Sequence, residues 1–290
     1  MPSPLSTQPA RVSGVFTIGG DLPVVRLGYG TMQLPGSGVW GEPRDHDEAI
    51  RVLRRAVDLG VTFIDTADSY GPEVSERLIR EALHPYPADL VIATKAGLTR
   101  PGPGRWERNG RPEYLKAQAE KSLQLLGVER IDLFHLHRID PRFPMADQLG
   151  ALAELQADGK IGLIGLSEVS VEEIRAARAI APIVSVQNLY NVSDRSAEPV
   201  LDFCEREGIG FIPWFPMATG QLARPGGPPQ RIADRHGVTA AQLALAWLLQ
   251  RSPVMLPIPG TSSVAHLEEN VDAALIQLTS DQMHQLENLS

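Results

Sequence analysis

The chain has 290 residues, and its hydrophobic fraction of 43% is enough for one large domain or two smaller ones. Its net charge of −8 argues against a nucleic-acid-binding protein, because phosphate binding requires a basic surface. The single cysteine, Cys204, excludes an intramolecular disulfide, and no apolar run approaches the roughly 20 residues that span a bilayer.

The amino-terminal residues 1–11 are rich in Pro and Ser and lack the apolar core of a signal peptide. We expect them to form a flexible tail on a cytoplasmic protein without membrane partners, followed by one domain over residues 12–290. Residues 12–25 place Gly19 and Gly20 between short apolar runs, which predicts a β-hairpin.

Strand-like and helix-like segments then alternate along the chain. Short apolar runs predict strands, and apolar residues at helical spacing, closed by Gly or Pro, predict helices. The predicted strands comprise residues 24–31, 61–64, 90–94, 131–136, 161–166, 183–186, 209–212 and 254–258. The predicted helices comprise residues 46–59, 74–83, 113–126, 146–157, 171–180, 197–207, 239–249, 263–274 and 280–289.

Eight strands alternating with helices predict an α/β fold, a (β/α)8 TIM barrel with an N-terminal β-hairpin and extra C-terminal helices. A doubly wound sheet is the alternative, but it usually has fewer strands, and its Gly-rich nucleotide turn is missing here. Long loops are expected at residues 97–112 and 217–229. Two helix starts carry a capping-box pattern, Asp45 with Glu48 and Thr279 with Gln282.

Polar or aromatic residues stand where six consecutive predicted strands end: Asp65, Lys95, His137, Ser167, Gln187 and Trp214. Barrel enzymes place their sites at this carboxyl edge, so we expect a functional site there. Tyr70 follows Asp65 by five residues and brings a phenol to the same edge. A purely structural ion pair between Asp65 and Lys95 is the alternative interpretation.

These side chains suit carbonyl reduction. A Lys95 ammonium about 4 Å from the Tyr70 phenol contributes up to about 4 kcal/mol at an effective dielectric constant of 20. That energy corresponds to roughly three pKa units, although desolvation of the phenolate opposes it. We therefore expect the pKa of Tyr70 to fall toward neutrality, where a general acid works best. None of these side chains supplies a hydride, which implies a nicotinamide cofactor.

Six motifs carry a resemblance to a known family: FIDTADSYG at residues 63–71, IATKAG at 92–97, DLFHLHRID at 132–140, GKIGLIGLS at 159–167, VQNLYN at 186–191, and IPG with HLEEN between 258 and 270. Together they closely resemble the aldo-keto reductase family. The resemblance implies NADPH-dependent reduction of a small-molecule aldehyde or ketone. We expect a monomer or a weak homo-oligomer.

The resemblance also implies roles for individual residues. The implied catalytic set is Asp65, Tyr70, Lys95 and His137, with Tyr70 as the proton donor to the carbonyl oxygen. Trp40 and Trp106 lie in loops near the barrel mouth and are expected to line the substrate pocket together with Tyr70 and His137.

The resemblance implies a cofactor that lies extended over the barrel mouth. Ser167 and Gln187 match positions that hold the carboxamide, and Trp214 matches the aromatic residue, usually tyrosine, that stacks on the nicotinamide ring. The remaining implied cofactor-binding residues are Gly30, Thr31, Asp65, Pro216, Met217, Thr219, Gly220, Gly260, Thr261, Ser262, His266, Glu269 and Asn270.

Three positions depart from the family pattern. Glu168 stands where the pattern has Asn, and we expect its carboxylate to point away from the carboxamide. Gly260 and His266 stand where some members have Lys and Arg for the 2′-phosphate. An anion could still be held by the hydroxyls of residues 261–263 at the start of the following helix, so we favour NADPH, with NADH as the alternative.

Two other functions are consistent with a barrel of this kind. One is a cofactor-binding regulatory subunit with little turnover, and the other is a metal-dependent hydrolase. His135 and His137 share a strand face, as two ligands of a metal site would. No further metal-spaced motif accompanies them in the sequence, so we expect no metal and interpret His135 as a core residue.

Overall fold

The structure is a computed structural model that describes residues 8–216 and 228–288. Its strands are β1 Val15–Ile18, β2 Leu22–Val25, β3 Tyr29–Gly30, β4 Phe63–Asp65, β5 Val91–Ala96, β6 Leu98–Gly102, β7 Arg105–Arg108, β8 Ile131–Leu136, β9 Ile161–Ser167, β10 Ile183–Leu189 and β11 Gly210–Trp214. Its helices are α2 His46–Asp58, α3 Val74–Leu83, α4 Pro112–Leu126, α5 Met145–Ala157, α6 Val171–Arg178, α7 Glu198–Glu207, α8 Pro228–His236, α9 Ala240–Arg251, α10 Val264–Asp272 and α11 Ser280–Glu287. Short 3₁₀ helices are η1 Pro9–Ser13, η2 Thr31–Gln33 and η3 Ala273–Leu275.

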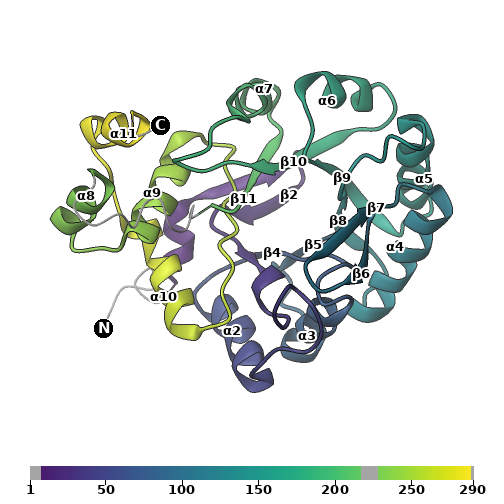
Figure 1. Ribbon diagram of the computed structural model, residues 1–290, viewed down its shortest axis with the longest axis horizontal. Helices are drawn as coiled ribbons and strands as arrows, with labels where there is room; N and C mark the ends of the chain where they lie inside the picture. The colour runs from purple at the N-terminus through teal and green to yellow at the C-terminus, as the bar shows by residue number, and fades with distance from the viewer. Residues whose placement is uncertain (1–7, 217–227, 289–290) are drawn as a thin grey trace.

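Seven strands form one parallel sheet in the order β11-β10-β9-β8-β5-β4-β3. The sheet curls, and helices α2 to α7 follow one another around its outside (Figure 1). Because a helix stands between each strand of this sheet and the next one along the chain, the strands run parallel and their carboxyl ends point to the same end of the molecule. The predicted α/β barrel is therefore confirmed.

The ring is closed by residues 254–259, which lie between β11 and β3. The carbonyl oxygen of Phe211 accepts a hydrogen bond from Leu256 N at 2.8 Å, and Gly28 N donates one to Pro257 O at 2.9 Å. This segment corresponds to the predicted eighth strand, but it makes only one bridge, Phe211 with Met255. Pro257 and Pro259 lack an N–H donor, so a regular ladder cannot form there.

The amino-terminal hairpin is present as predicted, with β1 paired antiparallel to β2. Its buried Ile18 and Val24 pack in one cluster with Phe63 and Leu133, which lie in the first halves of strands β4 and β8. The hairpin therefore covers the amino-terminal end of the barrel interior. The carboxyl-terminal end remains for the site.

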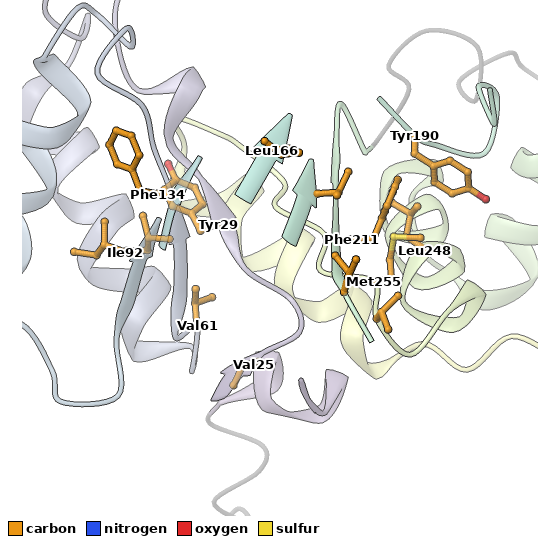
Figure 2. Packing of buried hydrophobic residues seen from close by; sticks show 14 of the residues in the cluster. Val25, Tyr29, Val61, Ile92, Phe134, Leu166, Tyr190, Phe211, Leu248 and Met255 are labelled. Carbon is orange, nitrogen blue, oxygen red and sulfur yellow. The ribbon is translucent and has the colours of Figure 1, made fainter. Parts of the chain in front are cut away.

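A larger apolar cluster fills the layer between the strands and the helices. Figure 2 shows Ile92, Phe134 and Phe211 among its side chains. The ring of Tyr190 lies 5.7 Å from that of Phe211 and stacks on Trp247 at 5.8 Å, measured between centroids. This packing anchors the strands whose ends carry the polar residues.

Part of the segment predicted as a flexible tail, residues 9–11, belongs to a 3₁₀ helix. Residues 1–7 lie outside the described chain, but Pro9–Ser13 forms the 3₁₀ helix η1. Ala10 is buried, and its N–H donates to Leu59 O at 3.2 Å. A Pro-rich composition had suggested mobility, whereas this backbone contact with the end of α2 orders the segment.

Two predicted loops contain regular structure. The segment 97–112 folds into the β6–β7 hairpin, because Gly104, with φ of +66°, provides its turn and Arg100 donates to the carbonyl oxygens of Val39 and Ser69. The end of the second loop begins α8 at Pro228, since proline is accepted in the first turn of a helix. The rest of that loop, residues 217–227, lies outside the described chain.

Only one of the two predicted capping boxes is complete. Thr279 and Gln282 exchange both hydrogen bonds. At α2, Asp45 accepts from Glu48 N, but the Glu48 carboxylate accepts from Val264 N of α10 at 2.9 Å instead of returning to the cap. In residues 8–216 and 228–288 we find no helix with the length and apolarity that crossing a membrane requires.

We predict opposite stability changes for alanine at two glycines. A Cβ on Gly165 would lie 2.3 Å from both His135 Cδ2 and Ser185 Oγ, so Gly165→Ala should destabilise the fold by about 1–3 kcal/mol through overpacking. Gly150, inside α5, has open space around its Cβ position, so Gly150→Ala should stabilise by about 0.5–1 kcal/mol. Thermal unfolding of both variants measures the difference, and equal shifts in melting temperature would contradict this packing.

Candidate active site

A cavity of about 590 Å³ opens at the carboxyl ends of the strands. This volume is within the range of small-ligand pockets. All but one of the six predicted strand-end residues line it: Asp65, His137, Ser167, Gln187 and Trp214. Lys95 lies beneath them and is fully buried. Tyr70 also lines the cavity, so the structure brings the four predicted catalytic residues to one place.

Lys95 is the centre of the polar contacts. Its Nζ donates to Asp65 Oδ2 at 2.6 Å and to Thr66 O at 2.8 Å, and it lies 3.4 Å from Tyr70 Oη. The second oxygen of Asp65 accepts from Gln187 Nε2 at 2.9 Å. All three donor positions of the ammonium and both carboxylate oxygens of Asp65 are thus occupied, as a buried ion pair requires.

The chain direction after β4 explains why Tyr70 reaches Lys95. Asp65 ends β4 opposite Ala93, and the following turn is held by Asp68 N donating to Lys95 O at 3.1 Å. Gly71 then adopts φ of +102°, and a Cβ there would lie 2.4 Å from Val74 Cβ. Glycine is therefore required directly after Tyr70 for the chain to turn into α3.

Burial and the neighbouring charges act in opposite directions on the pKa values of Tyr70 and Lys95. Burial raises the pKa of Tyr70 above its usual 10, and the nearby Lys95 ammonium opposes this rise without cancelling it. The expectation of a Tyr70 pKa near neutrality is therefore wrong, because desolvation of the phenolate outweighs the Lys95 charge. Burial also lowers the pKa of Lys95, but Asp65 and Tyr70 overcome this and leave it raised, so the ammonium stays charged.

His137 lies beside Tyr70 as a neutral imidazole. Burial lowers its pKa well below 6.5, and the charges of Lys95 and Arg138 add to that effect. Its ring centroid is 6.1 Å from that of Tyr70, and Ser69 Oγ lies 3.5 Å from its Nδ1. A neutral imidazole can donate one hydrogen bond into the cavity without carrying a charge there.

Trp106 completes an aromatic wall. Its ring centroid lies 6.3 Å from that of Tyr70 and 6.4 Å from that of His137. The guanidinium of Arg100 stacks over Trp106 at 3.6 Å and holds the hairpin against the turn after β4. Trp40, which was also predicted at the pocket, packs 5.7 Å from Arg100 and is not among the described residues that line the cavity.

Two cavity-lining arginines were not predicted, Arg108 and Arg138. Arg138 Nη1 donates to His137 O at 2.6 Å and to Ser167 Oγ at 2.9 Å. Neither arginine forms an ion pair with an acid in the described part of the chain. Arg138 directly follows His137 in the motif at residues 132–140, and that position was the signal available in the sequence.

The predicted cofactor-binding residues fall into three groups. Those that line the cavity in addition to the strand ends are Gly30, Pro216 and Gly260. Those placed elsewhere are Thr31, which donates to Asp65 O, and Thr261, Ser262, His266, Glu269 and Asn270, on the segment that leads into α10 and along it. Met217, Thr219 and Gly220 lie outside the described residues. Val264, the first residue of α10, donates its backbone N–H to Glu48, so this N–H is not available to an anion. The contact counts against the expected anion site at the start of α10.

Glu168 is not among the described residues that line the cavity, and its carboxylate bonds to the ends of two neighbouring strands. Its Oε1 accepts from Trp214 Nε1 at 2.6 Å and from Leu189 N at 2.7 Å. Its backbone has φ of +57°, a left-handed conformation that is unusual for a residue other than glycine. One carboxylate therefore connects the ends of β9, β10 and β11.

Two further buried acids, Glu76 and Asp68, lie close to the site. Thr94, which precedes Lys95, donates from Oγ1 to Glu76 Oε1 at 2.6 Å. Burial raises the pKa of Glu76 from 4.5 to about 7, and burial also raises the pKa of the neighbouring Asp68 well above its usual value. Among the described residues, we find no group of three or more His, Cys, Asp and Glu side chains arranged to hold a metal ion.

We predict that Glu76 makes stability depend on pH. Between pH 4.5 and 7 the folded chain keeps a Glu76 proton that the unfolded chain loses, so stability falls as the pH rises through this window. The loss is roughly 3 kcal/mol at 1.36 kcal/mol per pKa unit. Glu76→Gln should remove this component, so urea unfolding at several pH values should show the variant gaining stability over the wild type toward pH 7. The exposed Glu129→Gln is the control, and parallel curves for Glu76→Gln and wild type would contradict the prediction.

Comparisons with known proteins give consistent results. The sequence model of the Aldo/keto reductase family matches residues 26–290. An uncharacterized oxidoreductase of Schizosaccharomyces pombe is 52% identical over 262 residues, which cover 90% of this chain and 85% of that protein. Pyridoxine 4-dehydrogenase of Escherichia coli K12 is 43% identical over 284 residues, covering 96% and 99%. Among solved structures, an aldo-keto reductase from Klebsiella pneumoniae in complex with NADPH has a TM-score of 0.80 at 25% identity, covering 95% of this chain and 94% of that one.

Proposed function

We propose that the chain, which belongs to the aldo/keto reductase family of nicotinamide-dependent oxidoreductases, reduces small carbonyl compounds. The proposed reaction interconverts an aldehyde or ketone and the corresponding alcohol, with NADPH as the hydride donor and Tyr70 as the proton donor. The contact of Lys95 Nζ with both Asp65 Oδ2 and Tyr70 Oη, at 2.6 and 3.4 Å below the cavity, carries the proposal.

The residues of the cavity fit a nicotinamide cofactor. Trp214 offers a flat aromatic face, and Ser167 and Gln187 offer polar groups on strand ends beside it. Gln187 uses one N–H on Asp65, which leaves its carbonyl oxygen for a carboxamide N–H. When bound, NADPH supplies the hydride from C4 of the nicotinamide ring.

The chain's own residues manage the proton. With its pKa raised by burial, Tyr70 stays protonated while substrate binds, as a proton donor must. The neutral His137 orients the carbonyl oxygen by donating a hydrogen bond. As the carbonyl carbon accepts hydride, the oxygen takes the proton from Tyr70 Oη, and the Lys95 ammonium stabilises the resulting phenolate. Asp65 keeps Lys95 charged and directed at Tyr70.

The cavity also suggests a substrate class. Tyr70, Trp106 and Trp214 provide aromatic surfaces for a planar ring. Arg138 bonds only through Nη1 to described residues, so its other nitrogens remain available to an oxyanion. We therefore propose aromatic aldehydes that carry an anionic substituent. Pyridoxine 4-dehydrogenase, the 43% identical relative, is named for an aromatic alcohol, which supports the aromatic ring in this proposal; the anionic substituent rests on Arg138 alone.

Tyr70→Phe tests the proton donor. The variant keeps the ring packing but loses the hydroxyl, so kcat for 4-carboxybenzaldehyde with NADPH should fall about 10²–10⁴-fold. The Kd of NADPH, measured by titration calorimetry, should change little. Near-wild-type turnover would contradict the assignment, and a wild-type protein that binds NADPH without turnover would favour the regulatory-subunit alternative. Parallel assays with NADH test the proposed NADPH preference, which a higher kcat/KM with NADH would overturn.

Arg138→Gln tests the substrate class with a matched pair of aldehydes. The wild type should prefer 4-carboxybenzaldehyde to benzaldehyde, and the variant should lose about tenfold or more in kcat/KM for the charged substrate only, because a charge-assisted hydrogen bond is removed. Calorimetric titration with NADPH is the control, since Arg138 also contacts Ser167. Equal losses for both aldehydes would assign Arg138 a structural or cofactor-binding role instead.

A further inference from the structure

The ring that faces the proposed cofactor is bonded to a carboxylate. Trp214 lines the cavity, and its indole N–H donates to Glu168 Oε1 at 2.6 Å. The same oxygen accepts from Leu189 N at 2.7 Å. A short N–H···O bond to an ionised oxygen is about twice as strong as a neutral one. The indole is therefore held in orientation and polarised by one anion.

The local backbone is built around this contact. Glu168 and Phe215 adopt φ of +57° and +56°, conformations that cost energy in residues other than glycine. Glu168 directly follows the cavity-lining Ser167, and Phe215 directly follows Trp214 and lines the cavity itself. Asn191 Nδ2 donates to Phe215 O at 3.3 Å and holds the second turn. One strained residue, Glu168, is therefore the acceptor of the indole N–H, and the other, Phe215, directly follows the indole in the chain.

A carboxylate acceptor makes the indole more electron-rich. An aromatic face attracts a cation through its quadrupole, and Trp does so best among the aromatic residues. The nicotinamide ring is cationic in the oxidised cofactor and neutral in the reduced one, so a more negative indole face discriminates between the two forms. Asn or Gln at position 168 would keep a hydrogen-bond acceptor without the charge.

We propose that Glu168, acting through Trp214, makes the site bind the oxidised nicotinamide cofactor more tightly relative to the reduced form, which makes the bound reduced cofactor a stronger hydride donor. This inference rests on the proposed function, since it places the nicotinamide ring against Trp214. Glu168 is a positioning residue that touches the indole and not the reacting atoms. Arg138 is the nearby cation that interacts with Glu168, and the test must separate its charge from the indole effect.

A double-mutant cycle of Glu168→Gln and Trp214→Phe tests the proposal. Titration calorimetry measures the Kd of NADP⁺ and the Kd of NADPH for each variant. Glu168→Gln preserves the shape and an acceptor oxygen, and Trp214→Phe preserves an aromatic face but removes the N–H. Glu168→Gln should raise the ratio of the NADP⁺ Kd to the NADPH Kd about fivefold, which corresponds to ~1 kcal/mol, the size of an exposed cation–π contact. In the Trp214→Phe background, Glu168→Gln should leave the ratio unchanged.

Several outcomes would overturn the inference. A parallel rise of both dissociation constants in Glu168→Gln would mean a structural role only. The same ratio shift in the Trp214→Phe background would mean that the charge acts directly and not through the indole. The Trp214 Hε1 proton resonance, assigned by its loss in Trp214→Phe, should move upfield in Glu168→Gln, and an unmoved resonance would show that the hydrogen bond is not charge-assisted. Failure of the wild type to bind either cofactor would instead refute the proposed function itself.

Discussion

The buried ion pair of Asp65 and Lys95 is the interaction on which the site depends. Both side chains are almost completely withdrawn from water, so removing either would leave an uncompensated charge that costs several kcal/mol. The pair is tolerated because Thr66 O, Gln187 Nε2 and Tyr70 Oη satisfy the remaining hydrogen-bonding positions. Tyr70, the proposed proton donor, is therefore held by the same contacts that stabilise the buried charges.

The barrel supplies these contacts from different strands. Asp65 ends β4, Lys95 lies in β5, and Gln187 lies in β10 on the far side of the sheet order. Parallel strands with a common carboxyl edge bring them together. Residues 254–259 close the ring by backbone bonds to Phe211 and Gly28, which completes the wall of the cavity without a regular eighth ladder.

Around this centre, charged residues hold the aromatic rings that form the cavity. Arg100 stacks on Trp106 and bonds to the turn that carries Tyr70, so the β6–β7 hairpin becomes part of the site. Glu168 likewise holds the Trp214 ring in place by accepting a hydrogen bond from the indole N–H. The proposed substrate wall, which contains Trp106, and the proposed cofactor wall, which contains Trp214, are thus held by different charged residues.

The sequence by itself determined the barrel, the hairpin and the position of Asp65, Lys95 and His137, because apolar periodicity locates strands and parallel strands share one edge. It could not determine the direction of the Tyr70 pKa shift, which depends on how deeply the folded chain buries the phenol. The β6–β7 hairpin was equally hidden, since Arg100 stabilises it through carbonyl groups more than 30 residues away. Only the tertiary structure decided that Glu168 meets Trp214, because 46 residues separate them and a side-chain contact at that distance has no local signal.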